Sequence, residues 1–514
     1  MNSLNEEQYT EICKACDHIL LAPDASIERI AITWLHVIRE HPIFLSRYID
    51  LFYSVSLIKR VSRYGTRVLL GWAWWTRQLW RIMRANGQFW YGPKDLPVKV
   101  DFLFISHALN SKSIKTDDFY YCNLPNDLVS QGYTVMIGLI NQSGQSSKVL
   151  ANKVENCPFQ RVIFSDTLSF WGEVSLYCRL KKESSHLRLI GGKKISCLLR
   201  KAISRASQEA LTGNSQTTLR ISEQIGELVS QTNAKSIILL HEGHAWERVA
   251  FASARAAIPS INCFGYQQAI IFRLQHAIRR KLARKYNPDH IFTSGEFGAE
   301  QLRNVPELER IPVSVLGSDR GFIKGASVHK SVDKQRFNFK TCLVIPEGIP
   351  SECRILFEFS LACAEAFPDI LFVWRLHPLF TFESLGFSGK MKKNIPENIT
   401  LSQETLDIDI ARCRWALYRG TSAIIKAVGA GVRPLYLSIP EELSIDPLYE
   451  MKNWHTLITD IDDFRDVISA KLEFPYENEN SEEVYAKQYC LKFFSPFNLE
   501  ALTNAVELQR NFIV

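Results

Sequence analysis

Residues 98–106 read VKVDFLFIS and residues 133–140 read YTVMIGLI, and between them residues 117–132 read DDFYYCNLPNDLVSQG. The two outer stretches are apolar, β-rich runs of strand length, whereas the middle one has a helix-like pattern. A strand, a helix and a strand in this order predict a βαβ unit, which implies a parallel sheet covered by helices on both faces. The chain is therefore expected to belong to the α/β class.

The same alternation continues on both sides of a polar stretch at residues 321–340, which is expected to be a linker. It predicts two Rossmann-like domains, at residues 98–320 and 341–470. Residues 471–514 are expected to be C-terminal helices that close the two domains. The further runs expected as strands are RVIFSD (161–166), KSIILL (235–240), PSINCFGY (259–266), HIFTSG (290–295), PVSVLGS (312–318), KTCLVI (340–345), DILFVW (369–374), NITLSQ (398–403), RWALY (414–418) and RPLYLS (433–438).

Residues 1–97 differ in character and are expected to form a helical N-terminal extension. Its second half combines tryptophan, which favours the membrane–water boundary, with arginine, which pairs with lipid phosphate. One interpretation is a helix resting on the inner membrane surface; the other is a helical subdomain packed against the catalytic domains. The residues concerned are Lys59, Arg60, Arg63, Arg67, Arg77, Arg81, Arg84, Trp72, Trp74, Trp75, Trp80 and Trp90.

The composition of the 514-residue chain is that of an ordinary globular protein, with 46% apolar residues. A net charge of +7 favours nucleotide phosphates or anionic lipid headgroups, and it is too small and too dispersed to indicate nucleic acid. The N-terminal sequence lacks the pattern of a secretory signal, and no window has the ~18 uninterrupted apolar residues of a spanning helix. We therefore expect a cytoplasmic protein.

Three turns of the second domain follow expected strands and carry chemically useful residues. Residues at strand ends face the ligand crevice of a doubly wound sheet. Glu347 and Gly348 follow the first strand, Arg375 and His377 the second, and the Gly420-Thr421-Ser422 turn follows RWALY. Glycine permits close approach of a ligand, and hydroxyls and N–H groups at a helix start bind anions. A histidine here can donate a hydrogen bond to a phosphate oxygen of a leaving nucleotide.

In the first domain the informative sequence is HEGH at residues 241–244, after the strand KSIILL. It is not a zinc-protease motif, because position 245 is alanine. Glu242 is placed to accept the proton of an acceptor hydroxyl, with His241 and His244 beside it, while a structural hydrogen-bonded pair of His241 and Glu242 is the alternative.

Two further groups belong to the acceptor side of the first domain. Tyr266 and Gln267, at the end of the next expected strand, are expected to contact acceptor hydroxyls. A basic run follows, which suits either an anionic acceptor or a solvated helix face. Its residues are Arg279, Arg280, Lys281, Arg284 and Lys285.

The chain resembles bacterial surface-carbohydrate glycosyltransferases of the GT-B type over roughly residues 98–470. The resemblance lies in HEGHAWERVAFASARAA (241–257), GYQQA (265–269), PDHIFTSGE (288–296), RLHP (375–378) and YRGTSA (418–423). The His-Pro pair followed by a hydroxyl-bearing loop is similar to the bacterial sialyl-, polysialyl- and Kdo-transferases, which use CMP-activated acid sugars. The resemblance implies donor-phosphate contacts for His377, Thr421 and Ser422. An acid before glycine is also similar to the base motif of the polysialyltransferases, which implies Glu242.

The function expected from these observations is transfer of a sugar from a nucleotide-activated donor, with a CMP-linked nonulosonic or Kdo-like acid as the first choice. The acceptor would be a surface polysaccharide, such as O-antigen or capsule, or a lipid-linked saccharide. Two alternatives stay open: a UDP- or GDP-sugar transferase or CDP-polyol phosphotransferase on the same fold, and a non-catalytic scaffold of a polysaccharide assembly complex.

No metal or other cofactor is expected. Asp407 and Asp409 have the Asp-x-Asp spacing of a metal site, but acids near a helix start complement its dipole. The resemblance agrees, because GT-B enzymes as a group neutralise the leaving phosphate with side chains and helix dipoles.

Overall fold

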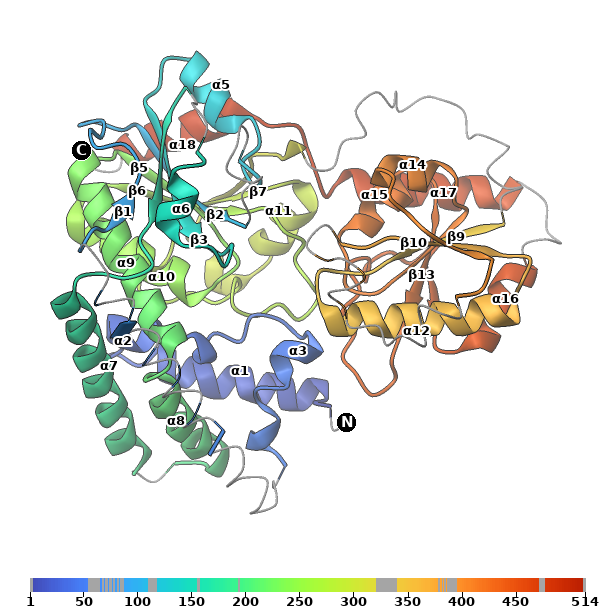
Figure 1. Cartoon of the computed structure of the whole chain (residues 1–514), viewed down its shortest axis with the longest axis horizontal. Helices are drawn as coiled ribbons and strands as arrows, with labels where there is room; N and C mark the ends of the chain where they lie inside the picture. The colour runs from blue at the N-terminus through green and yellow to red at the C-terminus, as the bar shows by residue number, and fades with distance from the viewer. Residues whose placement is uncertain are drawn as a thin grey trace.

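The chain folds around two separate parallel sheets, which lie in the left and right halves of Figure 1. Each sheet is flanked by helices, and the predicted α/β class is confirmed. The computed structural model describes residues 3–53, 87–109, 118–154, 158–192, 195–319, 340–377, 395–470 and 477–511, with isolated positions in 65–83 and 380–385.

The first domain contains an eight-stranded sheet in the order β1-β4-β3-β2-β5-β6-β7-β8. Without β1, which pairs antiparallel at the edge, this is the doubly wound order 3-2-1-4-5-6 with one further strand. Its inner strands β2, β3 and β5 are mainly apolar and almost completely buried because helices cover both faces. The strands are β1 (Trp90–Tyr91), β2 (Phe102–Ala108), β3 (Val135–Asn141), β4 (Gln160–Phe164), β5 (Ser236–Leu240), β6 (Asn262–Gln267), β7 (His290–Thr293) and β8 (Val313–Val315).

The helices of this domain include a long helical insertion between β4 and β5, formed by α7, α8 and α9. The extension expected to be helical up to residue 97 instead ends in a strand, because Trp90 and Tyr91 pair with β4. The helices are α5 (Leu124–Ser130), α6 (Ser147–Ala151), α7 (Phe170–Gly191), α8 (Cys197–Glu209), α9 (Gly213–Thr232), α10 (Ala245–Ala257) and α11 (Glu296–Arg303), with short 3-10 turns η3 (Arg284–Tyr286) and η4 (Pro306–Leu308).

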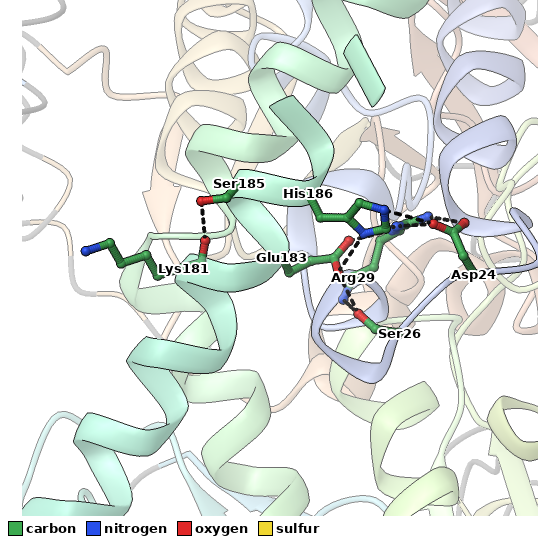
Figure 2. A network of polar contacts seen from close by, with 7 residues as sticks. All are labelled: Asp24, Ser26, Arg29, Lys181, Glu183, Ser185 and His186. Atoms are coloured by element: carbon green, nitrogen blue, oxygen red, sulfur yellow. Dashed lines mark hydrogen bonds and ion pairs between the residues drawn. The ribbon is translucent and has the colours of Figure 1, made fainter. Parts of the chain in front are cut away.

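The N-terminal helices pack on that insertion and share one apolar core with it. Polar contacts add to the junction (Figure 2): the buried Arg29 guanidinium reaches Glu183 of α7 at 2.6 Å and Asp24 at 3.0 Å. Ser26 also donates to Glu183 at 3.0 Å, and the His186 ring lies 3.3 Å from the guanidinium. The elements are α1 (Glu6–Leu20), α2 (Ile27–Ile30), η1 (Thr33–Leu35), α3 (Pro42–Leu45) and η2 (Ile49–Leu51).

The second domain has a six-stranded sheet in the order β11-β10-β9-β12-β13-β14, and its pairings are parallel. Renumbered within the domain, the order is again 3-2-1-4-5-6, the doubly wound arrangement. The strands are β9 (Thr341–Ile345), β10 (Leu371–Trp374), β11 (Ile399–Leu401), β12 (Trp415–Tyr418), β13 (Arg433–Leu437) and β14 (Thr456–Ile458), and the helices are α12 (Pro350–Ala366), α14 (Leu406–Ala411), α15 (Ala423–Gly429), α16 (Ile461–Ala470) and α17 (Glu477–Leu491).

The two C-terminal helices pack on different domains. Helix α17 packs on α15, whereas α18 (Leu499–Asn511) lies against the first domain and adds Leu502 and Ala505 to its core (Figure 1). The crossing segment is fixed by backbone hydrogen bonds, including Ser318 N to Ser495 O at 2.7 Å. At Gly317, φ is +96° and a Cβ would lie 2.1 Å from the Pro496 carbonyl oxygen, so this contact requires glycine.

Two sequence predictions fall mainly outside the described residues. The linker at 321–340 is one, and most of the tryptophan- and arginine-rich stretch is the other; of its named residues, only Trp80 and Trp90 are described. Among the helices that the structure does describe, none has the length and apolar character needed to cross a bilayer.

Candidate active-site cleft

Each sheet has one point where its strand order reverses, between β2 and β5 in the first domain and between β9 and β12 in the second. Open α/β sheets bind ligands outside the carboxyl ends of the strands at this switch point. The HEGH turn (241–244) directly follows β5. The turns at 346–348 and 419–422 directly follow β9 and β12. The predicted site sequences therefore occupy both switch points.

The turns of the second domain converge. A Cβ placed on Gly420 would lie 2.8 Å from Oε1 of Glu347, and one on Gly348 would lie 3.1 Å from the imidazole of His377. Both glycines let neighbouring turns approach more closely than a side chain would permit. Glu347, Gly348, His377 and Gly420 are thus brought together, as the donor-site prediction requires.

Glu347 is the centre of this cluster and is 7% exposed. His41 Nε2 lies 2.7 Å from Glu347 Oε1, and the Arg39 guanidinium lies 3.6 Å from Oε2. Burial alone would raise the pKa of the Glu347 carboxyl, but His41, Arg39 and Arg419 outweigh it and hold that pKa below its ordinary value. Glu347 is therefore ionised at neutral pH.

His377 has the opposite environment. Partial burial lowers the pKa of its imidazole, and the nearby Glu347 carboxylate only partly opposes this. At neutral pH His377 is therefore mainly uncharged, so it can offer a phosphate a hydrogen bond but little positive charge.

A cavity of about 370 Å³ lies between the domains, next to the converging turns. A volume of this order is within the range of small-molecule sites, roughly 300–1,000 Å³. Ser422 lines it, and among the described contacts its hydroxyl does not cap α15, which leaves the group available to a ligand. The lining residues are Arg39, Phe119, Gln268, Ala269, Ile270, Phe272, Leu406, Gly420, Ser422, Ala423, Lys426 and Phe494.

Arg375 and Thr421 were predicted to contact the donor, but in the structure their side chains contact other protein groups. The Arg375 guanidinium lies 2.8 Å from Asp409, a fully buried carboxylate that also accepts from Ser402 and Arg412. Thr421 is 6% exposed, and its Oγ1 accepts from the backbone N–H of Ala423 at 3.3 Å. These two side chains support the walls of the site.

One group of described residues has metal-ligand chemistry: ligand atoms of His41, Glu347 and Glu352 all lie within 4.8 Å of one another. Two guanidinium groups compete with a cation there, since Arg419 lies 2.8 Å from Glu352 and Arg39 lies 3.6 Å from Glu347. The charges of both carboxylates are thereby offset, so the group fits a cation poorly. Metal-independent action remains a prediction.

At the first switch point, Glu242 and His244 form a partly exposed pair, with 3.7 Å between Oε2 and Nε2. Burial opposes the charge of Glu242, but His244, Arg39 and His107 together lower the pKa of its carboxyl. Burial alone would lower the pKa of the His244 imidazole, but Glu242 and Glu247 outweigh it and raise that pKa. Burial lowers the pKa of His107 to about 4, so this ring is neutral at pH 7.

His241 is structural, and its partner is Glu247, which differs from the alternative pairing with Glu242. Glu247 Oε2 lies 3.1 Å from His241 Nδ1 and accepts the backbone N–H groups of Glu242, Gly243 and His244 at 2.8–3.1 Å. His241 is 1% exposed and has no route to an acceptor. This pair shapes the turn that presents Glu242.

Tyr266 and Gln267 are also buried, at 0% and 2% exposure, and the Tyr266 hydroxyl donates to the Gly317 carbonyl at 2.7 Å. Gln268, the next residue, lines the cavity, so any acceptor contact from this strand end falls to Gln268. Within the basic run, Arg280 is 4% exposed and pairs with Asp17 at 2.9 Å, whereas Arg284 and Lys285 are exposed on the short turn η3.

Gly243 should be indispensable to this turn. Its φ is +87°, and a Cβ would lie 2.3 Å from the backbone carbon of Ala277. We expect Gly243→Ala to lower stability by about 3 kcal/mol or more, because left-handed strain and a backbone clash add. Gly132→Ala is the matched control: its φ is also +87°, but its Cβ would meet open space, so about 1 kcal/mol is expected. Thermal melts that are equal for the two variants would contradict the tight packing of the turn.

Arg39 and His41 were not among the residues predicted from sequence. They lie between η1 and α3 in the extension, more than 300 residues from Glu347 along the chain. No spacing or motif relates them to the second domain; the one local signal is the charged sequence Arg39-Glu40-His41 after an apolar run.

No protein-family model matches the chain, and no curated protein sequence matches it. Among solved structures, the chain is similar to the glycosyltransferase SnogD from Streptomyces nogalater (14% identity, 80% of this chain and 100% of that one, TM-score 0.42). It is similar also to MurG from Acinetobacter baumannii (10% identity, 80% and 99%, TM-score 0.42). A third is the UDP-GlcNAc 2-epimerase from Neisseria meningitidis bound to UDP-GlcNAc (12% identity, 80% and 99%, TM-score 0.43).

Structural similarity at such low sequence identity does not assign an activity to the chain. The fold class is defined by the strand orders of the two sheets. Two doubly wound domains, with the second switch point bordering a cavity between them, define an α/β, GT-B-like protein with a helical N-terminal extension. The fold class predicted from the sequence is thereby confirmed.

Proposed function

We propose that this protein is a glycosyltransferase that transfers a sugar from a nucleotide-activated donor to a saccharide acceptor. The observation that carries the proposal is the convergence of Glu347, Gly348, His377 and Gly420 at the second switch point, together with the Glu242–His244 pair at the first. Nucleotides bind at such switch points, and the paired carboxylate and imidazole supply proton transfer.

In this proposal the second domain holds the donor. His377 donates a hydrogen bond to the phosphate, Ser422 contributes its hydroxyl, and the two glycines let the turns that carry His377 and Glu347 come together. During transfer the bond from the anomeric carbon to the donor phosphate oxygen breaks, and a bond from that carbon to the acceptor oxygen forms. The leaving nucleotide keeps the electron pair, and the hydrogen bond from His377 stabilises its growing charge.

The first domain accepts the proton released from the acceptor hydroxyl. Glu242 is ionised and partly exposed, and the His244 imidazole next to it has a pKa raised above its ordinary value by Glu242 and Glu247. A carboxylate and an imidazole 3.7 Å apart can pass a proton between them, so the proton is shared by the pair, with Glu242 as first acceptor. Gln268 is placed to contact the acceptor.

The donor of first choice is a CMP-linked nonulosonic or Kdo-like acid, and the acceptor a surface polysaccharide or a lipid-linked saccharide. These finer assignments rest on the His-Pro and Ser/Thr sequence resemblance. Work at the inner membrane surface is part of the proposal, and it is supported by exposed apolar side chains in the extension: Leu69 is 72% exposed, Trp80 53% and Met83 74%.

A thermal-shift screen against CMP, CDP, UDP and GDP tests the proposal. A ligand at about 100 times its Kd should stabilise the folded protein by about 2.7 kcal/mol. We expect the largest shift with CMP and its loss in His377→Ala, but not in the surface control His18→Ala. A shift with UDP or GDP instead would support the cleft as a nucleotide site, but the donor would then carry UDP or GDP in place of CMP. No shift with any nucleotide would favour a non-catalytic scaffold.

A further inference from the structure

Arg39 reaches the cleft from outside both Rossmann-like domains. It lies between η1 and α3 of the N-terminal extension, and its side chain lines the interdomain cavity. Gly420 and Ser422 of the second domain and Gln268 of the first line the same cavity. The extension therefore forms a third wall of the cleft.

Aromatic contacts fix the position of the Arg39 guanidinium. It lies 4.4 Å from the ring centroid of Phe272 and 5.6 Å from that of Phe44. Stacking on a ring leaves the N–H groups at the edge of the guanidinium plane available for hydrogen bonds. Within the described residues its ion pair is the 3.6 Å contact with Glu347, which is longer than a hydrogen bond. The side chain is 20% exposed.

The charge of Arg39 acts on both switch points. It contributes to the lowered pKa values of Glu242 in the first domain and Glu347 in the second. The other cation on the cavity wall, Lys426, is held by Asp407 at 2.7 Å, so its charge is locally offset. Arg39 is thus the cation best placed to meet an anionic group that enters between the domains.

We propose that Arg39 forms an anion-binding subsite in the cleft, which binds a phosphate or carboxylate group of the substrate through its guanidinium N–H groups. The inference rests on the proposed function and deepens it, because it assigns recognition of the substrate's charge to the N-terminal extension. Phosphate and carboxylate each present two oxygen atoms that the planar guanidinium fork can bind through two parallel N–H groups.

Calorimetric titration of the whole chain tests this subsite. The probes are cytidine, CMP, CMP-N-acetylneuraminate, UDP-GlcNAc and inorganic pyrophosphate, and the variants are Arg39→Gln, Arg39→Lys and the control Arg47→Gln, an exposed arginine on the same segment. Loss of a charge-assisted hydrogen bond should weaken binding about 10- to 100-fold. We expect that loss in Arg39→Gln, a smaller one in Arg39→Lys and none in Arg47→Gln, with unchanged melting temperatures.

The probes separate the two sources of the anion. Weaker binding of CMP with cytidine unaffected would place the phosphate at Arg39; weaker binding of CMP-N-acetylneuraminate alone would place the sugar carboxylate there. If Arg39→Gln matches Arg47→Gln for every anion, the subsite is refuted while nucleotide binding stands. If wild type binds no nucleotide, the proposed function fails, and pyrophosphate then decides the subsite by the same comparison of variants.

Discussion

Replacing Glu242 by glutamine should lower the rate of sugar transfer by about 10²- to 10⁴-fold, the range that a positioned general base contributes. Glutamine keeps the size and most hydrogen bonds of the side chain but cannot take a proton at neutral pH. Because Glu242 belongs to the first domain, binding of the nucleotide to the second should change little. The measurement is release of nucleotide from the donor that stabilises the protein most, with acceptor saccharide present, next to a titration of the nucleotide itself.

Glu300→Gln is the control for this variant, since Glu300 is a half-exposed glutamate of the same domain, far along the chain from the HEGH turn. The variant His244→Asn tests whether His244 shares the accepted proton with Glu242. If the pair acts together, both changes reduce the rate and alter its dependence on pH. Transfer at the wild-type rate in Glu242→Gln, with the nucleotide still bound, would remove Glu242 from the chemistry.

Replacing Arg29 by methionine should be among the most destabilising single changes in the extension. The guanidinium is 1% exposed and is shared by Glu183, Asp24 and His186 (Figure 2). Removing one member of a buried ion pair leaves an uncompensated buried charge and costs about 3–5 kcal/mol. At about 2–4 °C per kcal/mol, the first domain should melt roughly 6–20 °C lower.

Two further variants show whether burial of the charge is the cause. Arg179→Met removes a half-exposed arginine that pairs with Glu28 and Glu223, and about 0–1 kcal/mol is expected. The double change Arg29→Met with Glu183→Leu should recover part of the lost stability, because no buried charge is then left unpaired and Asp24 is half-exposed. A melting temperature of Arg29→Met equal to that of Arg179→Met would contradict the structural role of the network.

The strands could be predicted from the sequence because their patterning is local. Runs such as TCLVI at 341–345 are apolar on both faces, and they are strands in the structure. Which strands are neighbours is not local information, so the two reversals of strand order could not be derived from any one run. The end of the extension was misjudged for the same reason: Trp90 and Tyr91 are a strand only because β4 lies beside them.

The candidate site was predictable to the extent that it depends on strand ends. Glu347, Gly348, His377 and Gly420 were found this way, and they converge. Position along the chain does not tell where a side chain points. The sequence therefore could not show that Arg375 pairs with Asp409 and that its neighbour His377 faces Gly348.

The remaining differences have the same physical origin. Tyr266 and Gln267 are the last residues of β6 and are buried within the sheet layer, whereas Gln268, one residue later, reaches the cavity. Arg39 and His41 enter the site through tertiary packing of a separate segment, and no periodicity or motif records such packing.

The central claim is that one ligand binds between the two switch points. Hydrogen exchange of the protein with and without bound nucleotide tests this claim most directly. We predict slower exchange at residues 345–348 and 419–423 of the second domain, together with residues 36–42 of the extension and 241–244 of the first domain. Protection confined to the surface cavity around residues 233–235 and 258–262 would contradict the account, as would nucleotide binding without protection at either switch point.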